Sequence, residues 1–180
     1  MVHFLIPQTN KLFQTKDQVH KIYWAVVDKR PPKYEDTITH YLIKNEERNR
    51  SYAYDEKGEG TKFASLTYRH VASIERYHLL EIELHTGRHH QIRVQLKQLG
   101  LHIKGDLKYG FPRSNPDKGI HLHARKLEFI HPVKKEMLSI VADPPEDPVW
   151  DAFLDLFRRG KFSPVAPIYI SLSEAECPIN

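Results

Sequence analysis

The chain has 180 residues, with 27 lysine and arginine residues against 23 aspartate and glutamate residues, which gives a formal net charge of +4. At 40% hydrophobic and 28% charged residues it can bury a core, which excludes a disordered polyelectrolyte. The single cysteine, Cys177, excludes an internal disulfide, and no stretch approaches the roughly 20 apolar residues of a membrane span. We therefore expect a globular, cytoplasmic protein that is a monomer.

The first half of the chain has the period of β-strands. Residues 22–27 are apolar on both alternating faces, which favours a central strand covered on both sides. Alternating patterns predict three further strands, at residues 37–43, 63–72 and 80–84, the last two joined by a turn. Residues 45–61 have turn composition and little apolar content, so we expect a surface excursion without an element of its own.

The pattern then changes to the period of a helix. Ile92, Leu96 and Leu99 predict a helix over residues 89–99, with Thr86 as its cap and Gly100 just after its end. Two strands at residues 121–130 and 137–142 and an amphipathic helix at 147–159 follow. Six strands, mostly in antiparallel hairpins, and two helices predict the α+β class. We expect residues 1–159 to form one domain and residues 160–180 an extended C-terminal tail.

The densest polar segment is residues 85–93, which spans the end of a strand, a glycine turn and the start of the helix. Backbone N–H groups at a helix start, with Arg88 beside them, suit a phosphate. The alternative is an ordinary strand-to-helix junction that carries solvated charge. Arg93 lies at the edge of the buried helix face, so its guanidinium needs a carboxylate or phosphate partner.

A basic surface interleaved with aromatic residues is expected around the loop that contains Lys104, Lys108, Tyr109 and Arg113, because it adds to Arg88, Lys97 and Arg125. Such a composition is typical of a surface that holds a nucleic-acid backbone and stacks unpaired bases. A lysine-rich solvated loop is the alternative interpretation.

A metal site is the other chemistry that the histidines suggest. His121 and His123 share one face of a strand, but no carboxylate or cysteine stands beside them at ligand spacing and several arginines crowd the same segments. We therefore expect no metal ion and no cofactor.

Several ordered motifs give the sequence a family resemblance. His85-Thr86-Gly87-Arg88-His89-His90-Gln91-Ile92-Arg93, followed by Gly105-Asp106, Tyr109-Gly110, Leu122-His123-Ala124 and His131-Pro132, resembles the RluA-type (RluA/RsuA) family of RNA pseudouridine synthases. The strand Lys21-Ile22-Tyr23-Trp24-Ala25-Val26-Val27 is also similar to a strand of that family. The resemblance extends from about Asn10 to Phe157.

The resemblance implies a pseudouridine-synthase catalytic domain, a mainly antiparallel sheet with flanking helices whose cleft takes a flipped uridine from structured RNA and isomerises it to pseudouridine without a cofactor. Tyr23 matches the tyrosine that packs on the target base, and Arg93 matches the arginine that pairs with the catalytic aspartate. The implied partner is ribosomal or transfer RNA. The residues expected to contact it are Arg88, His89, His90, Lys104, Lys108, Tyr109, Arg113 and Arg125.

The sequence departs from the family at its N-terminus. Ile6 follows Val2-His3-Phe4-Leu5 where the family has its nucleophilic aspartate, and neither Asp17 nor Asp28 has that motif around it. We therefore expect a pseudouridine synthase by descent whose chemical step is impaired, with a non-catalytic RNA-binding module as the alternative. We also expect Arg93 to lack a carboxylate partner from the N-terminal segment, and to be relieved by solvent or a bound anion.

Overall fold

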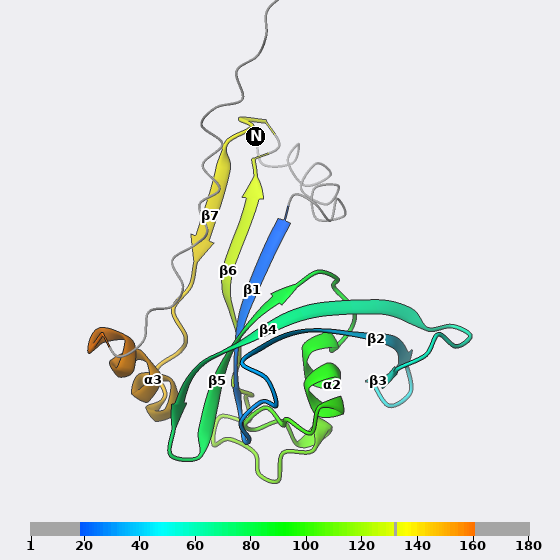
Figure 1. Cartoon of the computed structure of the whole chain (residues 1–180), viewed down its shortest axis with the longest axis horizontal. Coiled ribbons are helices and arrows are strands. Elements are labelled where there is room, and N and C mark those ends of the chain that lie inside the picture. The colour runs from blue at the N-terminus through cyan, green and yellow to red at the C-terminus, as the bar shows by residue number, and fades with distance from the viewer. Residues whose placement is uncertain (1–18, 132, 161–180) are drawn as a thin grey trace, which may run out of the picture.

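A computed structural model describes residues 19–131 and 133–160, which form a seven-stranded sheet with a helix on each face (Figure 1). Every pair of neighbouring strands is antiparallel, in the order β3-β2-β4-β5-β1-β6-β7. The strands are β1 (Val19–Val27), β2 (Glu35–Asn45), β3 (Arg50–Tyr54), β4 (Lys62–Ile74), β5 (Tyr77–Leu84), β6 (Leu122–Ile130) and β7 (Met137–Val141). The helices are α2 (Gln91–Gln98), the short 3₁₀ helix η2 (Leu107–Tyr109) and α3 (Pro148–Arg158). The predicted α+β class is confirmed.

Strand β1 has apolar residues on both faces because a helix covers each face. Ala25 and Val27 pack in one core cluster with Leu96 of α2. Trp24 and Val26, which alternate with them, pack in a second cluster that includes Phe153 of α3. Burial of one such aromatic side chain stabilises a fold by about 1.5–3 kcal/mol. The sequence-based prediction of a central strand covered on both sides is therefore confirmed.

Strand β3 was not predicted, so the expectation of an element-free excursion over residues 45–61 is wrong. Residues Arg50–Tyr54 pair with β2 from Tyr41 to Asn45 and form one edge of the sheet. Within β3 only Ser51 is buried. An edge strand with so little buried apolar surface has only a weak hydrophobic pattern in its sequence, which is why composition indicated a loop.

Helix α2 begins two residues later than expected. His90 precedes it in the left-handed conformation, with φ of 51°, and its side chain makes no capping hydrogen bond. Thr86 was expected to be the cap. It instead donates from Oγ1 to the side-chain oxygen of Gln91 (2.7 Å) and accepts from the backbone N–H of Ser65 (2.9 Å), so it fastens the helix start to β4. The helix ends at Gln98, one residue earlier than expected, and Gly100 follows shortly after it with φ of 74°, as predicted.

The chain after α2 returns along the end of β1. The backbone N–H of Lys104 donates to Val26 O (2.9 Å), and that of His121 donates to Lys104 O (2.9 Å). Asp28 accepts from both the backbone N–H and the ring Nδ1 of His102 (2.9 Å each). These contacts between distant parts of the chain bring η2 and its flanking residues back beside α2.

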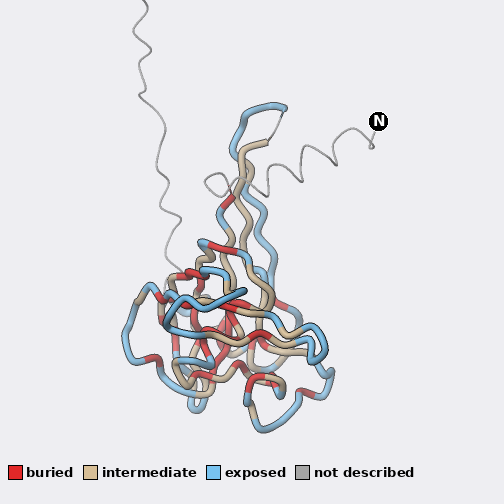
Figure 2. Tube along the Cα trace, turned by 90° about the vertical axis from the view of Figure 1, so that its right-hand side faces the viewer, coloured by how far each residue is buried: buried red, intermediate tan, exposed pale blue. Residues whose placement is uncertain are grey.

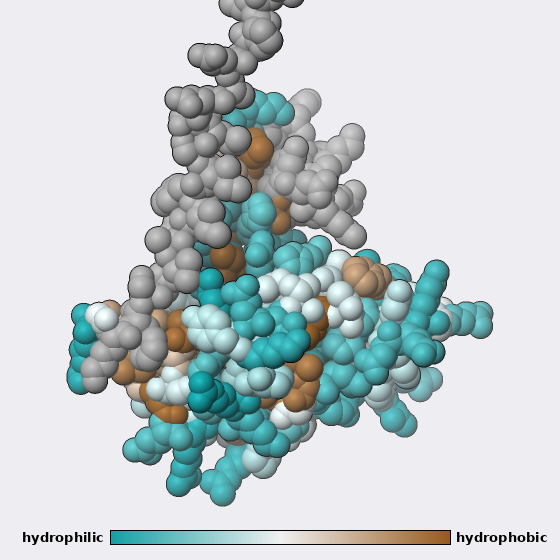
Figure 3. All heavy atoms as spheres, in the orientation of Figure 1, coloured by the Kyte–Doolittle hydropathy of each residue, from teal (hydrophilic) through white to brown (hydrophobic). Residues whose placement is uncertain are grey.

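The far ends of β1, β6 and β7 project from the rest of the described structure (Figure 1). Figure 2 shows few buried residues in this projection, and Figure 3 shows apolar side chains on its surface. Large apolar side chains are more than half exposed on β7 and the turn before it: Val133, Met137, Ile140 and Val141.

Helix α3 begins with a side-chain cap, because Asp147 accepts from the backbone N–H of Val149 (2.8 Å).

Candidate nucleic-acid interface

In the polar segment before and at the start of α2, one set of side chains faces the sheet and has a structural role. Gln91 is buried, and its side-chain oxygen accepts from the backbone N–H of Arg88 (2.9 Å) while its nitrogen donates to Ser65 O (3.0 Å). Together with Thr86, Gln91 thereby fixes the turn that precedes the helix. The neighbouring side chains of His89, His90 and Arg93 are consequently held at the opposite, partly exposed side of the junction.

Arg93 is paired with Asp106. Its Nε donates to Oδ2 and its Nη2 to Oδ1, both at 2.7 Å, and the Asp106 side chain is only 1% exposed. The expectation that Arg93 would rely on solvent or a bound anion is wrong. The reason is the return of the chain after α2, where Gly105 adopts φ of 85° and places Asp106 against the helix.

Tyr109 lies under this pair instead of at the surface. It is 2% exposed, its hydroxyl accepts from the backbone N–H of Ser51 (2.8 Å), and the Arg93 guanidinium lies 4.8 Å from its ring centroid. Tyr109 is therefore not a surface residue, and its contact with RNA stays a prediction. Its hydroxyl and ring connect β3, α2 and η2, so its role is to position the residues around it.

His90 joins Tyr109 to Arg93. Its Nδ1 lies 3.0 Å from the Tyr109 hydroxyl, and Arg93 Nη1 donates to its Nε2 at 3.0 Å. Since Nε2 accepts this bond, the neutral ring carries its proton on Nδ1. Burial, followed by the charge of Arg93, lowers the pKa of His90 to about 4. His90 is therefore a neutral ring at physiological pH, stacked on His89 with ring centroids 3.8 Å apart.

Tyr23 lies on the face of the sheet that α2 covers. It packs against the core cluster of Ala25 and Ile82, beside a β-bulge between Ile22 and Tyr23. Burial raises the pKa of its phenol, so the ring stays neutral. Among the described residues no hydrogen bond or ring contact joins Tyr23 to Arg93, although both lie on this side of the sheet.

The remaining predicted RNA contacts divide between the two faces. Arg113 is exposed, whereas Arg88 is half-buried and donates from Nε to Phe63 O (2.9 Å). Lys108 donates to the backbone oxygen of Asn49 (2.9 Å) on the α2 side. Lys104 donates to Asn115 Oδ1 (2.7 Å), so its amino group stabilises the loop. Arg125 lies on the opposite, α3 side, where its guanidinium is 4.5 Å from the Trp24 ring centroid. The structure therefore does not bring Arg125 together with Arg88 and Lys108, and the Lys104 amino group likewise lies 6.0 Å from the ring centroid of Tyr77, a residue of the α3-side cluster.

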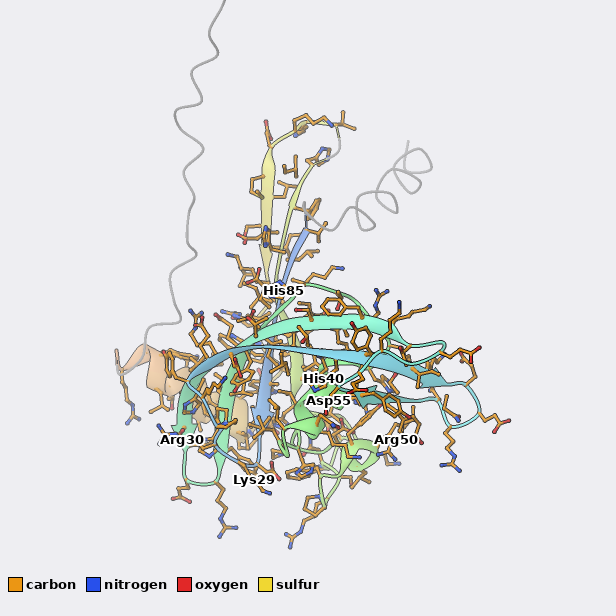
Figure 4. The ribbon with its side chains drawn as sticks, turned by 45° about the vertical axis from the view of Figure 1, so that its right-hand side comes forward. Lys29, Arg30, His40, Arg50, Asp55 and His85 are labelled. Carbon is orange, nitrogen blue, oxygen red and sulfur yellow. The ribbon has the colours of Figure 1, made fainter. Side chains whose placement is uncertain are left out.

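Two residues of the interface were missed because β3 was missed. Ser51 donates from Oγ to the backbone oxygen of His89 (2.6 Å) and lies 2.9 Å from its Nδ1. Arg50 places its guanidinium 5.1 Å from the Tyr109 ring centroid. Figure 4 shows Arg50 on the side of the fold where β3 lies, well apart from Lys29 and Arg30. The alternation of Tyr52 and Tyr54 was the available signal for this strand.

A pocket of about 440 Å³ lies against the Arg93–Asp106 pair, and its lining includes Lys108, Lys118 and Ser114. Apart from Asp106, whose charge is already paired, the charged groups in this lining are cationic. A pocket of this size and sign suits one nucleotide unit with its phosphate.

The described part of the chain contains neither a candidate metal site nor a candidate membrane-spanning helix. Residues 19–131 and 133–160 contain no group of three or more histidine, cysteine, aspartate or glutamate side chains that could hold a metal ion. In the same ranges, no helix combines the length and apolar character needed to cross a membrane.

Comparison with known proteins identifies the family. Residues 5–98 match the model of the family described as RNA pseudouridylate synthase, which is more than half of the chain. The chain belongs to the RNA pseudouridylate synthase family. It is 34% identical over 147 residues to a protein of Chlorobaculum parvum and 32% identical over 139 residues to one of Synechocystis, both named as uncharacterized RNA pseudouridine synthases. These matches cover 72% and 76% of this chain but only 45% and 42% of the relatives, so the chain spans less than half of their length.

Solved structures of this family share the fold. The human RNA pseudouridylate synthase domain containing 1 superposes with a TM-score of 0.66 at 22% identity, covering 86% of this chain and 69% of that one. The human domain containing 4 gives a TM-score of 0.65 at 23% identity, covering 89% and 69%. The expected fold is thereby confirmed. The predictions for Ile6 and Asp17 and for the tail from residue 161 lie outside the described residues.

Proposed function

We propose that this chain binds structured RNA, either ribosomal or transfer RNA, and acts on uridine as an RNA pseudouridine synthase of the cytoplasm, without a cofactor and as a monomer. Family membership supports the reaction type, and it is the observation on which the proposal depends. Relatives named ribosomal large subunit pseudouridine synthase D, 28% identical, and tRNA pseudouridine synthase C, 33% identical, support the two RNA classes. The cationic pocket beside Arg93 supports binding of the anionic backbone.

The roles of Tyr23 and Arg93 follow from their surroundings. A neutral, partly buried phenol on the α2 face offers a flat ring for a flipped base to stack on. The Arg93 guanidinium is held in one orientation by Asp106 and by the Tyr109 ring beneath it. A fixed guanidinium can direct an anionic group without reorganisation, which is the property that a catalytic arginine needs.

The reaction exchanges two bonds of the nucleotide. The C1′–N1 glycosidic bond breaks, a C1′–C5 bond forms, N1 gains a proton and the proton on C5 leaves to solvent. A carboxylate is needed to initiate glycosidic cleavage as a nucleophile or base. Within the described ranges, the carboxylates of Asp28, Asp106 and Asp147, all discussed above, are hydrogen-bonded to His102, to Arg93 and to the start of α3, respectively.

The hydrogen bonds that already occupy these aspartates favour a second candidate function, a non-catalytic RNA-binding module. Asp106 is 1% exposed and accepts three hydrogen bonds, and Asp28 accepts two from His102, so both carboxylates already have structural partners. In this case the chain would hold RNA through the same residues and leave its uridines unchanged.

One experiment separates the two functions. The chain is incubated with transfer and ribosomal RNA labelled with tritium at uridine C5, and both bound RNA and released tritium are measured. Tritium release that is lost in Tyr23→Leu supports the synthase. Binding that weakens with salt, without release, supports the RNA-binding module. Absence of salt-dependent binding would contradict both functions.

A further inference from the structure

The hairpin of β2 and β3 is fastened to the interface by side chains from two other elements. Ser51 donates its backbone N–H to the Tyr109 hydroxyl (2.8 Å) and its hydroxyl to His89 O (2.6 Å). Lys108 of η2 donates to Asn49 O (2.9 Å), one residue before the start of the strand. Arg50 stands between these anchored residues, so its backbone is fixed relative to α2 and η2.

The Arg50 side chain is half-buried and lies beside two aromatic rings, with its guanidinium carbon 5.1 Å from the Tyr109 centroid and 5.9 Å from that of Tyr52. Within the described ranges its guanidinium has no carboxylate and no hydrogen-bond acceptor, unlike that of Arg93. Glu46, an acidic residue of the same hairpin, is bound to Lys44 instead (2.5 Å). Arg50 therefore keeps its charge and its N–H donors available while aromatic contacts restrict its movement.

The surroundings of Arg50 are cationic. The charges of Lys44, Lys108 and Arg93 act, after burial, to lower the pKa of His89, against the single opposing charge of Glu46. Lys108 also lines the pocket beside Arg93 and Asp106, so the hairpin and the pocket share one edge. An anionic group bound at Arg50 would therefore lie next to a unit bound in the pocket.

We propose that Arg50, flanked by Lys108, binds a backbone phosphate of the RNA adjacent to the nucleotide unit in the pocket. The inference rests on the proposed function and adds a second contact point on the RNA, supplied by the β2–β3 hairpin. The planar fork of a guanidinium matches two phosphate oxygens, and Tyr109 and Tyr52 limit the orientations that this fork can take. This contact positions the strand and carries no sequence information of its own.

The test compares two arginines of one hairpin. Arg48 is exposed at the turn, so Arg48→Gln removes the same charge as Arg50→Gln away from the aromatic rings. Binding of a fluorescently labelled stem–loop RNA with uridines in its loop is measured for the full chain between 0.05 and about 0.5 M salt. Arg50→Gln should reduce the slope of log Kd against log salt by roughly 0.7–0.9 and weaken binding about fivefold near 0.1 M salt. Arg48→Gln should leave the slope unchanged.

A third variant and a folding control complete the design. Arg50→Lys keeps the charge and loses the fork, so it should restore the slope while leaving part of the affinity loss. Thermal midpoints within a few degrees of the wild-type value show that the variants are folded. Equal slopes for Arg50→Gln and Arg48→Gln, with a wild-type chain that binds, overturn this subsite and leave the proposed function standing. A wild-type chain without salt-dependent binding overturns both.

Discussion

Arg93 of α2 and Asp106 of the following loop meet side-on through two parallel hydrogen bonds of 2.7 Å, thirteen residues apart in the chain. The Asp106 side chain is almost completely buried and the Arg93 side chain is 16% exposed. This pair decides where the loop lies, because Asp106 also accepts from the backbone N–H of Tyr109 (3.2 Å). The orientation of Arg93, the burial of Tyr109 and the shape of the pocket therefore depend on one carboxylate.

Asp106→Asn should destabilise the fold strongly. Removing one partner of a buried ion pair leaves an uncompensated charge, and such changes cost about 3–5 kcal/mol in free energy of unfolding. Urea denaturation followed by circular dichroism measures this loss. Asp155→Asn is the matched control, since its pair with Arg158 is on the surface and should cost no more than ~1 kcal/mol. Equal losses in the two variants would contradict the structural role of the buried pair.

Gly105→Ala should cost more than Gly100→Ala, although both glycines have positive φ values, of 85° and 74°. A Cβ on Gly105 would lie 2.4 Å from Asn115 Nδ2 and 2.6 Å from Gly119 O, whereas a Cβ on Gly100 would meet nothing within 4 Å. Backbone strain alone predicts a loss of about 1 kcal/mol at Gly100, and the added clash predicts about 2–4 kcal/mol at Gly105. Thermal unfolding of both variants provides the comparison, and a smaller loss at Gly105 would be inconsistent with this packing.

The sequence predicted the elements whose hydrophobic pattern is local. The central strand β1 was found because residues 22–27 are apolar on both faces, and α2 was found because Ile92 and Leu96 repeat at helical spacing. Strand β3 was missed because its signal depends on pairing with β2 at the sheet edge. Because β3 was missed, Arg50 was missed as well, whose guanidinium has no acceptor among the described residues.

The sequence predicted which residues belong to the candidate site, but it did not predict their contacts or the face of the sheet on which each one lies. The partner of Arg93 depends on the return of the chain along β1, which long-range backbone hydrogen bonds of Lys104 fix. The face of Arg125 was hidden by a β-bulge, since Ala124 lies opposite Tyr23 and Lys126 opposite Ile22, which leaves Arg125 as an extra residue. An alternation pattern read from the sequence carries no information about such an insertion.

The two faces of the sheet should differ in their contribution to RNA binding. Arg88→Gln removes a half-buried charge on the α2 side, whose Nε donates to Phe63 O, and should reduce the slope of log Kd against log salt by roughly 0.7–0.9. Arg125→Gln removes a charge on the α3 side, where the guanidinium is bound to Asp143 (2.6 Å), and should leave the slope unchanged. Filter binding with transfer RNA at several salt concentrations measures both. A larger effect of Arg125→Gln would place the RNA on the α3 face instead.

The neutral state of His90 should make the protein less stable in mild acid. The pKa of His90 is about 4 in the folded protein against 6.5 for an unperturbed ring, so between these values the unfolded chain binds more protons. The contribution of His90 to stability is therefore complete above pH 6.5 and is lost as the pH falls toward 4. Protonation at Nε2 would place an N–H donor against the Arg93 Nη1 donor, which is why Arg93 lowers the pKa of His90.

Two measurements check the titration of His90. The ring-proton NMR signal of His90 should titrate with a midpoint near 4, and Lys108→Gln should raise that midpoint, because the positive charge of Lys108 also lowers the pKa. His90→Asn, which suits the left-handed conformation at this position, should weaken the pH dependence of the free energy of unfolding between pH 6.5 and 4. A midpoint at or above 6.5 in the wild-type chain would mean that His90 does not accept the hydrogen bond from Arg93.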